Sequence, residues 1–136
     1  VVFGGKQLRP NLHIEDYCGV IECLIKAPND KIKDQIFNVG YQNLSIAEIA
    51  NKVKKVVEGY FPDKGNIEIE TTPSDDNRSY HINSDKIKQE LGFVPKLTIE
   101  DAVRDLCAAF KENKIPNSFE DDFYFNLKRL KRINAK

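Results

Sequence analysis

The sequence has no methionine and no tryptophan, and it has only 2 histidines and 3 cysteines among its 136 residues. The cysteines, Cys18, Cys23 and Cys107, are odd in number and show no C-x-x-C spacing, which argues against a disulfide framework and against a zinc site. His13 and His81 are too few to hold a metal without carboxylates at ligand spacing. We therefore predict reduced, mostly buried thiols and no metal centre.

An excess of either charge and a long apolar run are also absent. The 21 basic residues balance the 21 acidic ones, and binding to a phosphate backbone needs a basic excess, so nucleic acid is not the expected partner. No stretch approaches the roughly 20 apolar residues of a membrane span. No charged-then-apolar leader opens the chain, which predicts a cytoplasmic protein. The hydrophobic share of 40% excludes general disorder.

Glycine-rich phosphate loops are absent as well. Gly4-Gly5 lacks the G-x-G-x-x-G spacing and no G-x-x-x-x-G-K-[ST] occurs, so there is no complete dinucleotide or nucleoside-triphosphate fingerprint. Tyr60 and Lys64 have the Y-x-x-x-K spacing of an acid/base pair, which requires a helix. Gly59 and Pro62 interrupt any helix there. We predict that Tyr60 packs, that Lys64 is solvated, and that the chain carries no catalytic residue.

The lack of methionine extends to position 1, and the chain opens on the apolar run Val1–Phe3, which is typical of the middle of a strand. Together these observations predict a piece of a longer polypeptide. Removal of an initiator methionine before Val1 is the alternative explanation of the first observation.

Periodicity predicts short strands alternating with amphipathic helices, the pattern of an α/β protein. The predicted strands are Val1–Phe3, Leu12–Ile14, Gln35–Val39 and the alternating run 67–70. A first helix is predicted to begin with Asp16 as its N-cap and to bury a stripe made of Tyr17, Val20, Ile21, Leu24 and Ile25. Capping boxes predict helices over 45–57 and 98–110, and a short helix is expected over 85–91.

Two arginines stand in irregular, polar segments, where binding residues concentrate. Arg9 lies in Gln7-Leu8-Arg9-Pro10, and Arg78 lies in the segment 75–79. Two guanidinium forks that converge from separate loops suit a diphosphate, because each fork donates a pair of hydrogen bonds. On spacing alone, two exposed loop arginines are the better interpretation.

Five segments, taken in order, resemble one known family. Residues 9–16 (R-P-N-L-H-I-E-D), 37–40 (F-N-V-G) and 76–80 (D-N-R-S-Y) resemble motifs of the extended short-chain dehydrogenase/reductases that act on nucleotide sugars. Residues 86–95 (K-I-K-Q-E-L-G-F-V-P) and 98–110 resemble the next two motifs. The resemblance implies an α/β fold, the C-terminal part of a Rossmann-type extended short-chain dehydrogenase. It covers residues 1–112, and leaves 113–136 as an aromatic and basic helical tail.

The same resemblance implies a function, namely the part of an NAD(P)-dependent nucleotide-sugar epimerase or dehydratase that binds the nucleoside-diphosphate sugar. Arg9 and Arg78 resemble the two arginines with which the family contacts the substrate diphosphate. Weaker candidates for substrate binding are Asn38, Gln7, Asn11 and Tyr80. The family carries its glycine-rich loop and its Ser/Tyr/Lys catalytic set in an N-terminal half, so NAD or NADP would bind mainly there. The chain alone is then expected to bind no cofactor and to be inactive, and a homodimer would form through upstream residues.

Two alternatives stay open. The chain is also consistent with a stand-alone, non-catalytic binding or interaction module of the same architecture. The basic run 128–136 would suit nucleic acid, although an acid-first, base-last helix that begins near Glu120–Asp122 explains it as well. The sequence does not distinguish epimerisation, dehydration and reduction.

Overall fold

A computed structural model describes residues 1–76 and 78–134. Asn77 of the arginine-bearing loop, and Ala135 and Lys136 of the basic tail, lie outside the described residues. The chain divides into two compact units, Val1–Arg104 and Asp105–Lys136, and the division falls within a helix. The functional division after residue 112 stays a prediction.

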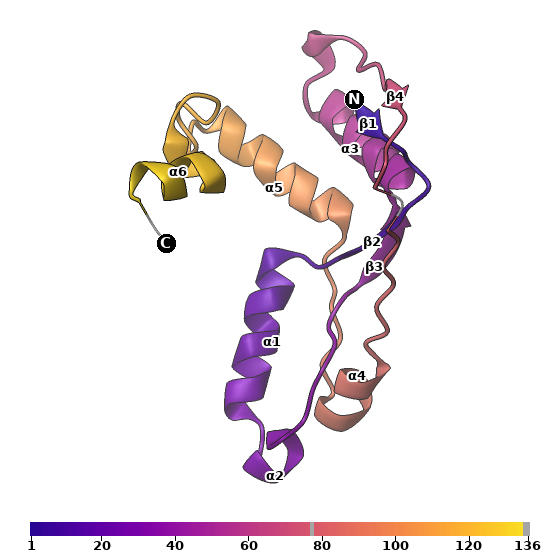
Figure 1. Ribbon diagram of the computed structural model, residues 1–136, viewed down its shortest axis with the longest axis vertical. Coiled ribbons are helices and arrows are strands. Elements are labelled where there is room, and N and C mark those ends of the chain that lie inside the picture. The colour runs from indigo at the N-terminus through magenta and orange to yellow at the C-terminus, as the bar shows by residue number, and fades with distance from the viewer. Residues whose placement is uncertain (77, 135–136) are drawn as a thin grey trace. The chain divides into compact units, whose positions relative to one another are not determined.

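Two small sheets organise the first unit (Figure 1). Strand β1 (Val2–Phe3) pairs in parallel with β4 (Thr71–Thr72), and β2 (Leu8–Asn11) pairs antiparallel with β3 (Gln42–Ser45). The pairing of β1 with β4 confirms the first predicted strand over Val2–Phe3, and Val2 is buried. The predicted strand 67–70 is wrong, because the strand that pairs with β1 is β4. The run 67–70 contributes one backbone hydrogen bond to β1, in which Val2 N donates to the Glu70 carbonyl at 2.7 Å.

The predicted strand Leu12–Ile14 is also wrong. The strand in this region, β2, ends at Asn11, and helix α1 (Ile14–Lys26) begins three residues later. The prediction treated Pro10 as part of a turn before the strand, because proline usually marks a turn, whereas Pro10 lies within β2. In a sheet of only two strands both strands are edges, and an edge strand tolerates a residue without an N–H. Here Pro10 lies opposite Asn43 in β3.

Helix α1 is capped by His13 and not by Asp16 as predicted. The His13 Nδ1 atom accepts a hydrogen bond from the Glu15 backbone N–H at 3.2 Å. Asp16 lies in the first turn and is only 9% exposed. Its Oδ2 atom accepts hydrogen bonds from the backbone N–H groups of Lys96 at 3.0 Å and Leu97 at 2.8 Å. Asp16 therefore ties α1 to the segment that precedes the last helix of the unit.

The outer face of α1 differs from the prediction as well. Val20 is buried and Leu24 is half-buried, as predicted. Tyr17, Ile21 and Ile25 are 53%, 45% and 79% exposed. The helix therefore turns Asp16 and Val20 inward, and much of its apolar stripe faces outward. Cys18 is exposed, against the prediction of mostly buried thiols, whereas Cys23 is half-buried and Cys107 is buried.

The segment Gln35–Val39, predicted as a strand, runs between the short helix α2 (Asn29–Ile32) and β3 without regular structure. A strand exists only when its backbone groups pair with a neighbour. Among the residues that the structure describes, the backbone N–H and C=O groups of Phe37, Asn38 and Val39 have no hydrogen-bond partner. Residues 35–39 therefore have the sequence pattern of a strand, but no described strand pairs with them.

The capping boxes were predicted correctly. Helix α3 (Ile46–Tyr60) begins at Ser45, whose hydroxyl accepts from Glu48 N while the Glu48 carboxylate accepts from Ser45 N. Helix α5 (Ile99–Lys111) begins with the same exchange between Thr98 and Asp101. Helix α4 (Asp85–Leu91) ends at Gly92, whose φ of 71° is the left-handed conformation that glycine adopts without strain.

The second unit contains the end of α5, the 3₁₀ turn η2 (Asp122–Tyr124) and helix α6 (Asn126–Arg132). The Phe110 and Phe119 rings stack with centroids 6.4 Å apart. The predicted acid-first, base-last helix does not begin near Glu120–Asp122, because α6 begins at Asn126 and has no acidic residue in its first turn. Asp122 of η2 instead pairs with two basic residues of α6, Arg132 at 2.9 Å and Arg129 at 3.9 Å. No helix within 1–76 or 78–134 is both long and apolar enough to cross a membrane.

Candidate anion-binding site

The two predicted arginines meet. Arg9 extends from β2, and Arg78 lies in the loop that follows β4. The Arg9 Nη1 atom donates to the Arg78 carbonyl at 2.6 Å and to the Leu8 carbonyl at 2.9 Å. The loop is itself fastened to β2, because Leu8 N donates to Ser79 Oγ at 2.9 Å and Tyr80 N donates to the Leu8 carbonyl at 3.1 Å. Both arginines therefore stand on backbone that is held by hydrogen bonds.

Asp76 joins the two guanidinium groups. Arg78 donates to it bidentately, with Nε to Oδ1 at 2.8 Å and Nη2 to Oδ2 at 2.9 Å. Arg9 Nη2 lies 3.5 Å from the same Oδ2 atom. We name Arg9, Asp76 and Arg78 the arginine–aspartate cluster. Asp76 belongs to the segment 76–80 that resembles a motif of the family, but the sequence predicted no role for it, because its partner Arg9 is distant in the sequence.

The charges of this cluster are fixed at neutral pH. The hydrogen bonds from Arg78 lower the pKa of Asp76 to about 2, and the nearby charges of Arg78 and Arg9 act in the same direction. The contact with Asp76 raises the pKa of Arg78 above its ordinary value. Because the carboxyl pKa is depressed in the folded chain, any stabilisation from the ion pairs is present above the ordinary aspartate pKa and lost as the pH falls through about 2.

Two of the weaker candidates lie beside the cluster. The Arg9 guanidinium lies over the Tyr80 ring, 5.4 Å from its centroid. The Gln7 amide accepts from Gly5 N at 2.7 Å and donates to the Phe3 carbonyl at 2.8 Å. Gly4 is required here, because its φ is +79° and an added Cβ would lie 2.6 Å from the Gln7 amide nitrogen.

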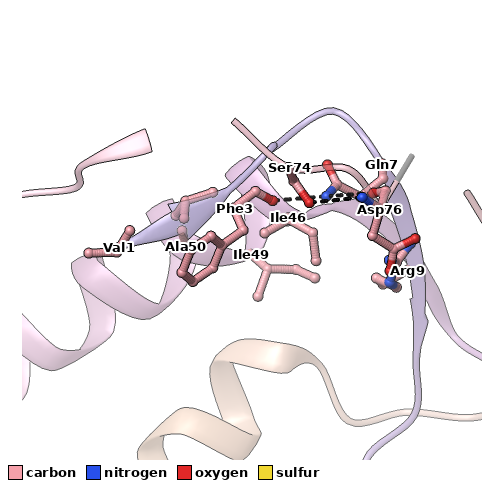
Figure 2. A pocket seen from close by; sticks show the side chains of 10 residues that line it. Val1, Phe3, Gln7, Arg9, Ile46, Ile49, Ala50, Ser74 and Asp76 are labelled. Carbon is pink, nitrogen blue, oxygen red and sulfur yellow. Dashed lines mark hydrogen bonds and ion pairs between the residues drawn. The ribbon is translucent and has the colours of Figure 1, made fainter. Parts of the chain in front are cut away.

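An open pocket of about 530 Å³ adjoins the cluster (Figure 2). Its polar end is formed by Gln7, Arg9 and Asp76. Its apolar wall comes from β1 and α3, with Phe3, Ile46, Ile49 and Ala50 among the lining residues. The arrangement can hold a ligand that is flat and apolar at one end and anionic at the other. Sequence reasoning missed this wall, because the periodicity of α3 marks its apolar face without showing what that face lines.

The structure does not bring Asn11 or Asn38 into the cluster. The Asn11 amide donates to the Arg9 carbonyl at 2.7 Å and to the Gln42 carbonyl at 3.1 Å, which fastens β2 to β3. Asn38 is exposed, and none of the cluster's hydrogen bonds between described residues involves it. Within the same described residues, no group of three or more potential metal-ligating side chains gathers.

No protein-family model matches the sequence, whereas solved structures match the fold. L-threonine dehydrogenase from Clostridium difficile gives a TM-score of 0.66 at 23% identity, covering 85% of this chain and 36% of that one. The dTDP-glucose 4,6-dehydratase from Bacillus anthracis, solved in complex with NAD, gives 0.65 at 21% identity, covering 88% and 37%. UDP-glucose 4-epimerase from Bifidobacterium longum, solved with NAD⁺ and UDP, gives 0.58 at 22% identity, covering 79% and 31%.

These similarities show the fold. The chain is an α/β protein with the fold of one part of the Rossmann-type extended short-chain dehydrogenases, as the sequence predicted. It spans only 31–37% of the length of the three solved proteins.

Proposed function

We propose that this chain binds the nucleoside-diphosphate sugar in an NAD(P)-dependent nucleotide-sugar epimerase or dehydratase. The observation that carries the proposal is that Asp76, which lines the polar end of a pocket with an apolar wall, joins the guanidinium groups of Arg9 and Arg78. The arginines would take the diphosphate, and the wall formed by Phe3 and Ile49 would take the base. A substrate held in this way is fixed at its diphosphate while its sugar reaches the reacting groups.

The solved proteins of this fold also include a threonine dehydrogenase, so a small amino acid is the competing class of substrate. The single carboxylate of an amino acid needs only one guanidinium fork, whereas a diphosphate can occupy two. The Arg9–Arg78 pair therefore favours the diphosphate. A small amino acid also has no large apolar group that could cover the apolar wall of the pocket.

In this proposal a cofactor-binding part outside this chain supplies the rest of the enzyme. Bound NAD or NADP would accept and return a hydride of the sugar. The residues 1–112 would contribute binding and orientation, and the chain alone would be inactive. Cytoplasmic location and a homodimer formed through upstream residues stay predictions.

Two features of the described residues favour this proposal over a stand-alone module. Ile14, Tyr17, Ile21 and Ile25 leave an apolar stripe exposed along α1, and such stripes normally face a partner. The stretch Phe37–Val39 has the composition of a strand and free backbone groups. It is held at its ends, where Ser84 Oγ bonds both Gly40 N and O at 2.8 Å and Lys86 Nζ donates to the Ile36 carbonyl at 3.0 Å. We infer that the α1 stripe packs against the cofactor-binding part, and that the stretch Phe37–Val39 pairs with a strand of its sheet.

A pair of neighbouring substitutions tests whether the α1 stripe is free in this chain. Ile21→Asp is expected to change the urea midpoint little, because Ile21 is 45% exposed. Val20→Asp is expected to unfold much of the chain, because Val20 is only 6% exposed and an unpaired charge would be buried there. Equal destabilisation by the two substitutions would show that the stripe is packed within the chain and would remove this argument for a partner.

Calorimetric titration of the 136-residue chain tests the substrate class. Uridine diphosphate is expected to bind, and uridine monophosphate to bind at least about tenfold more weakly, because it can engage only one arginine at a time. L-Threonine at millimolar concentration is expected neither to bind nor to displace uridine diphosphate. Displacement by L-threonine with no preference for the diphosphate would reject the nucleotide-sugar proposal in favour of an amino-acid substrate.

A further inference from the structure

Both arginines of the cluster already hold an anion that belongs to the chain. The Nε–Nη2 edge of Arg78, one of the edges through which a guanidinium forms bidentate pairs, is filled by the Asp76 carboxylate at 2.8 and 2.9 Å. The same carboxylate faces Arg9 at 3.5 Å. A ligand that uses both arginines in the usual bidentate way therefore meets a site that is occupied.

The occupying group is free to leave. The Asp76 side chain is 40% exposed and that of Arg78 is 72% exposed, so water can replace their contact. Apart from the two arginines, the only donor within hydrogen-bond distance of the carboxylate is the Arg78 backbone N–H, at 3.2 Å, among the described residues. No described residue other than Arg9 and Arg78 holds the carboxylate. A rotation of its side chain would release the Nε–Nη2 edge of Arg78 and the Nη2 atom of Arg9.

We propose that Asp76 is an internal counter-anion, which a ligand must displace from Arg9 and Arg78, and that this exchange selects diphosphates over single anionic groups. The inference rests on the proposed function, whose binding site it refines. A single carboxylate or phosphoryl group would replace Asp76 on one fork and gain little, because one charged contact is exchanged for another. A diphosphate adds a second anionic group and reaches both forks at once, so only the diphosphate gains from the exchange.

The contrary role for Asp76 is that of a positioning residue, which holds the arginines in place for the ligand. The two roles predict opposite results when the carboxylate is neutralised. Loss of a competitor tightens ligand binding, whereas loss of a brace weakens it. The neighbouring Asp75 provides a matched control, because it is exposed and its side chain forms no hydrogen bond or ion pair with any described residue.

The test compares Asp76→Asn with Asp75→Asn in the 136-residue chain, using inorganic phosphate and inorganic pyrophosphate as probes. Binding is followed by the arginine Nε–Hε resonances in NMR spectra. Asp76→Asn is expected to tighten phosphate binding about three- to tenfold and pyrophosphate binding less, so the preference for pyrophosphate falls. Asp75→Asn is expected to leave that preference unchanged. The Arg78 Nε–Hε resonance of the unliganded chain should shift in Asp76→Asn alone.

Weaker binding of both probes to Asp76→Asn would overturn the proposal and assign Asp76 the positioning role. Equal changes in the two variants would also overturn it, because the effect would then be one of net charge. No binding of either probe to Asp76→Asn would overturn it as well. The proposed function fails on a different result, namely that uridine diphosphate binds the unaltered chain no more tightly than pyrophosphate, and the Asp76 result stands in that case.

Discussion

Replacing Arg78 by alanine is expected to weaken the binding of uridine diphosphate by about tenfold to a hundredfold, the usual effect of losing a charge-assisted contact. Arg78 presents a bidentate fork to Asp76, which lines the pocket, and its removal leaves Arg9 alone for the diphosphate. The binding of uridine monophosphate, which engages one fork, should fall less. Calorimetric titration of both nucleotides measures the difference directly.

The matched control for this prediction is Arg104→Ala. Arg104 also pairs with an aspartate, since its Nη2 atom lies 2.6 Å from Asp101 Oδ1, and its side chain is 52% exposed. Neither residue belongs to the arginine–aspartate cluster. Arg104→Ala is therefore expected to leave nucleotide affinity unchanged. Similar losses in the two variants, or no loss in Arg78→Ala, would contradict the placement of the diphosphate at Arg78.

Replacing Asp16 by alanine is expected to lower the free energy of unfolding by about 1–3 kcal/mol, because two partly buried backbone N–H groups lose their acceptor and each lost hydrogen bond costs about 0.5–1.5 kcal/mol. These donors are Lys96 N and Leu97 N, at 3.0 and 2.8 Å from the carboxylate. Asp16 is 9% exposed, so water replaces the lost acceptor poorly. Urea unfolding followed by circular dichroism measures the loss.

The variant Asp16→Asn separates the acceptor from the charge. The asparagine carbonyl oxygen is able to accept from Lys96 N and Leu97 N as Oδ2 does, so most of the stability should be retained. A loss as large as that of Asp16→Ala would show that the carboxylate charge matters more than the hydrogen bonds. No loss in either variant would show that the contact between α1 and the 96–97 backbone contributes nothing to folding.

The predictions for Arg78 and Asp16 both depend on contacts between segments that are distant in sequence. The sequence predicted a binding role for Arg78 but the wrong role for Asp16. Arg9 and Arg78 were identified by their resemblance to a family, and the structure brings them together. Asp16 was assigned to a local role, the helix cap, which His13 fills. A cap requires partners two or three residues away, and both His13 and Asp16 offer an acceptor near the start of α1. In the folded chain the backbone N–H groups of Lys96 and Leu97 donate to the Asp16 carboxylate, and His13 caps the helix.

The sequence by itself determined the features whose partners are close along the chain. The capping boxes at Ser45–Glu48 and Thr98–Asp101, and the helix end at Gly92, each require only a few successive residues. For that reason these helix boundaries, and the alternation of strands and helices that defines the fold class, could be predicted with no tertiary information.

The tertiary structure alone decided everything that needs a distant partner. Periodicity showed that α1 has an apolar stripe, but it could not show that Val20 would be covered and Ile21 would not. The residues 35–39 have the composition of a strand, but a strand also needs a neighbour, and the described residues supply none. Asp76 became the shared partner of two arginines only because the loop after β4 is bonded to β2. Hydrogen bonds and burial between segments distant in sequence are set by the packing of the whole chain, and local residue patterns carry no record of them.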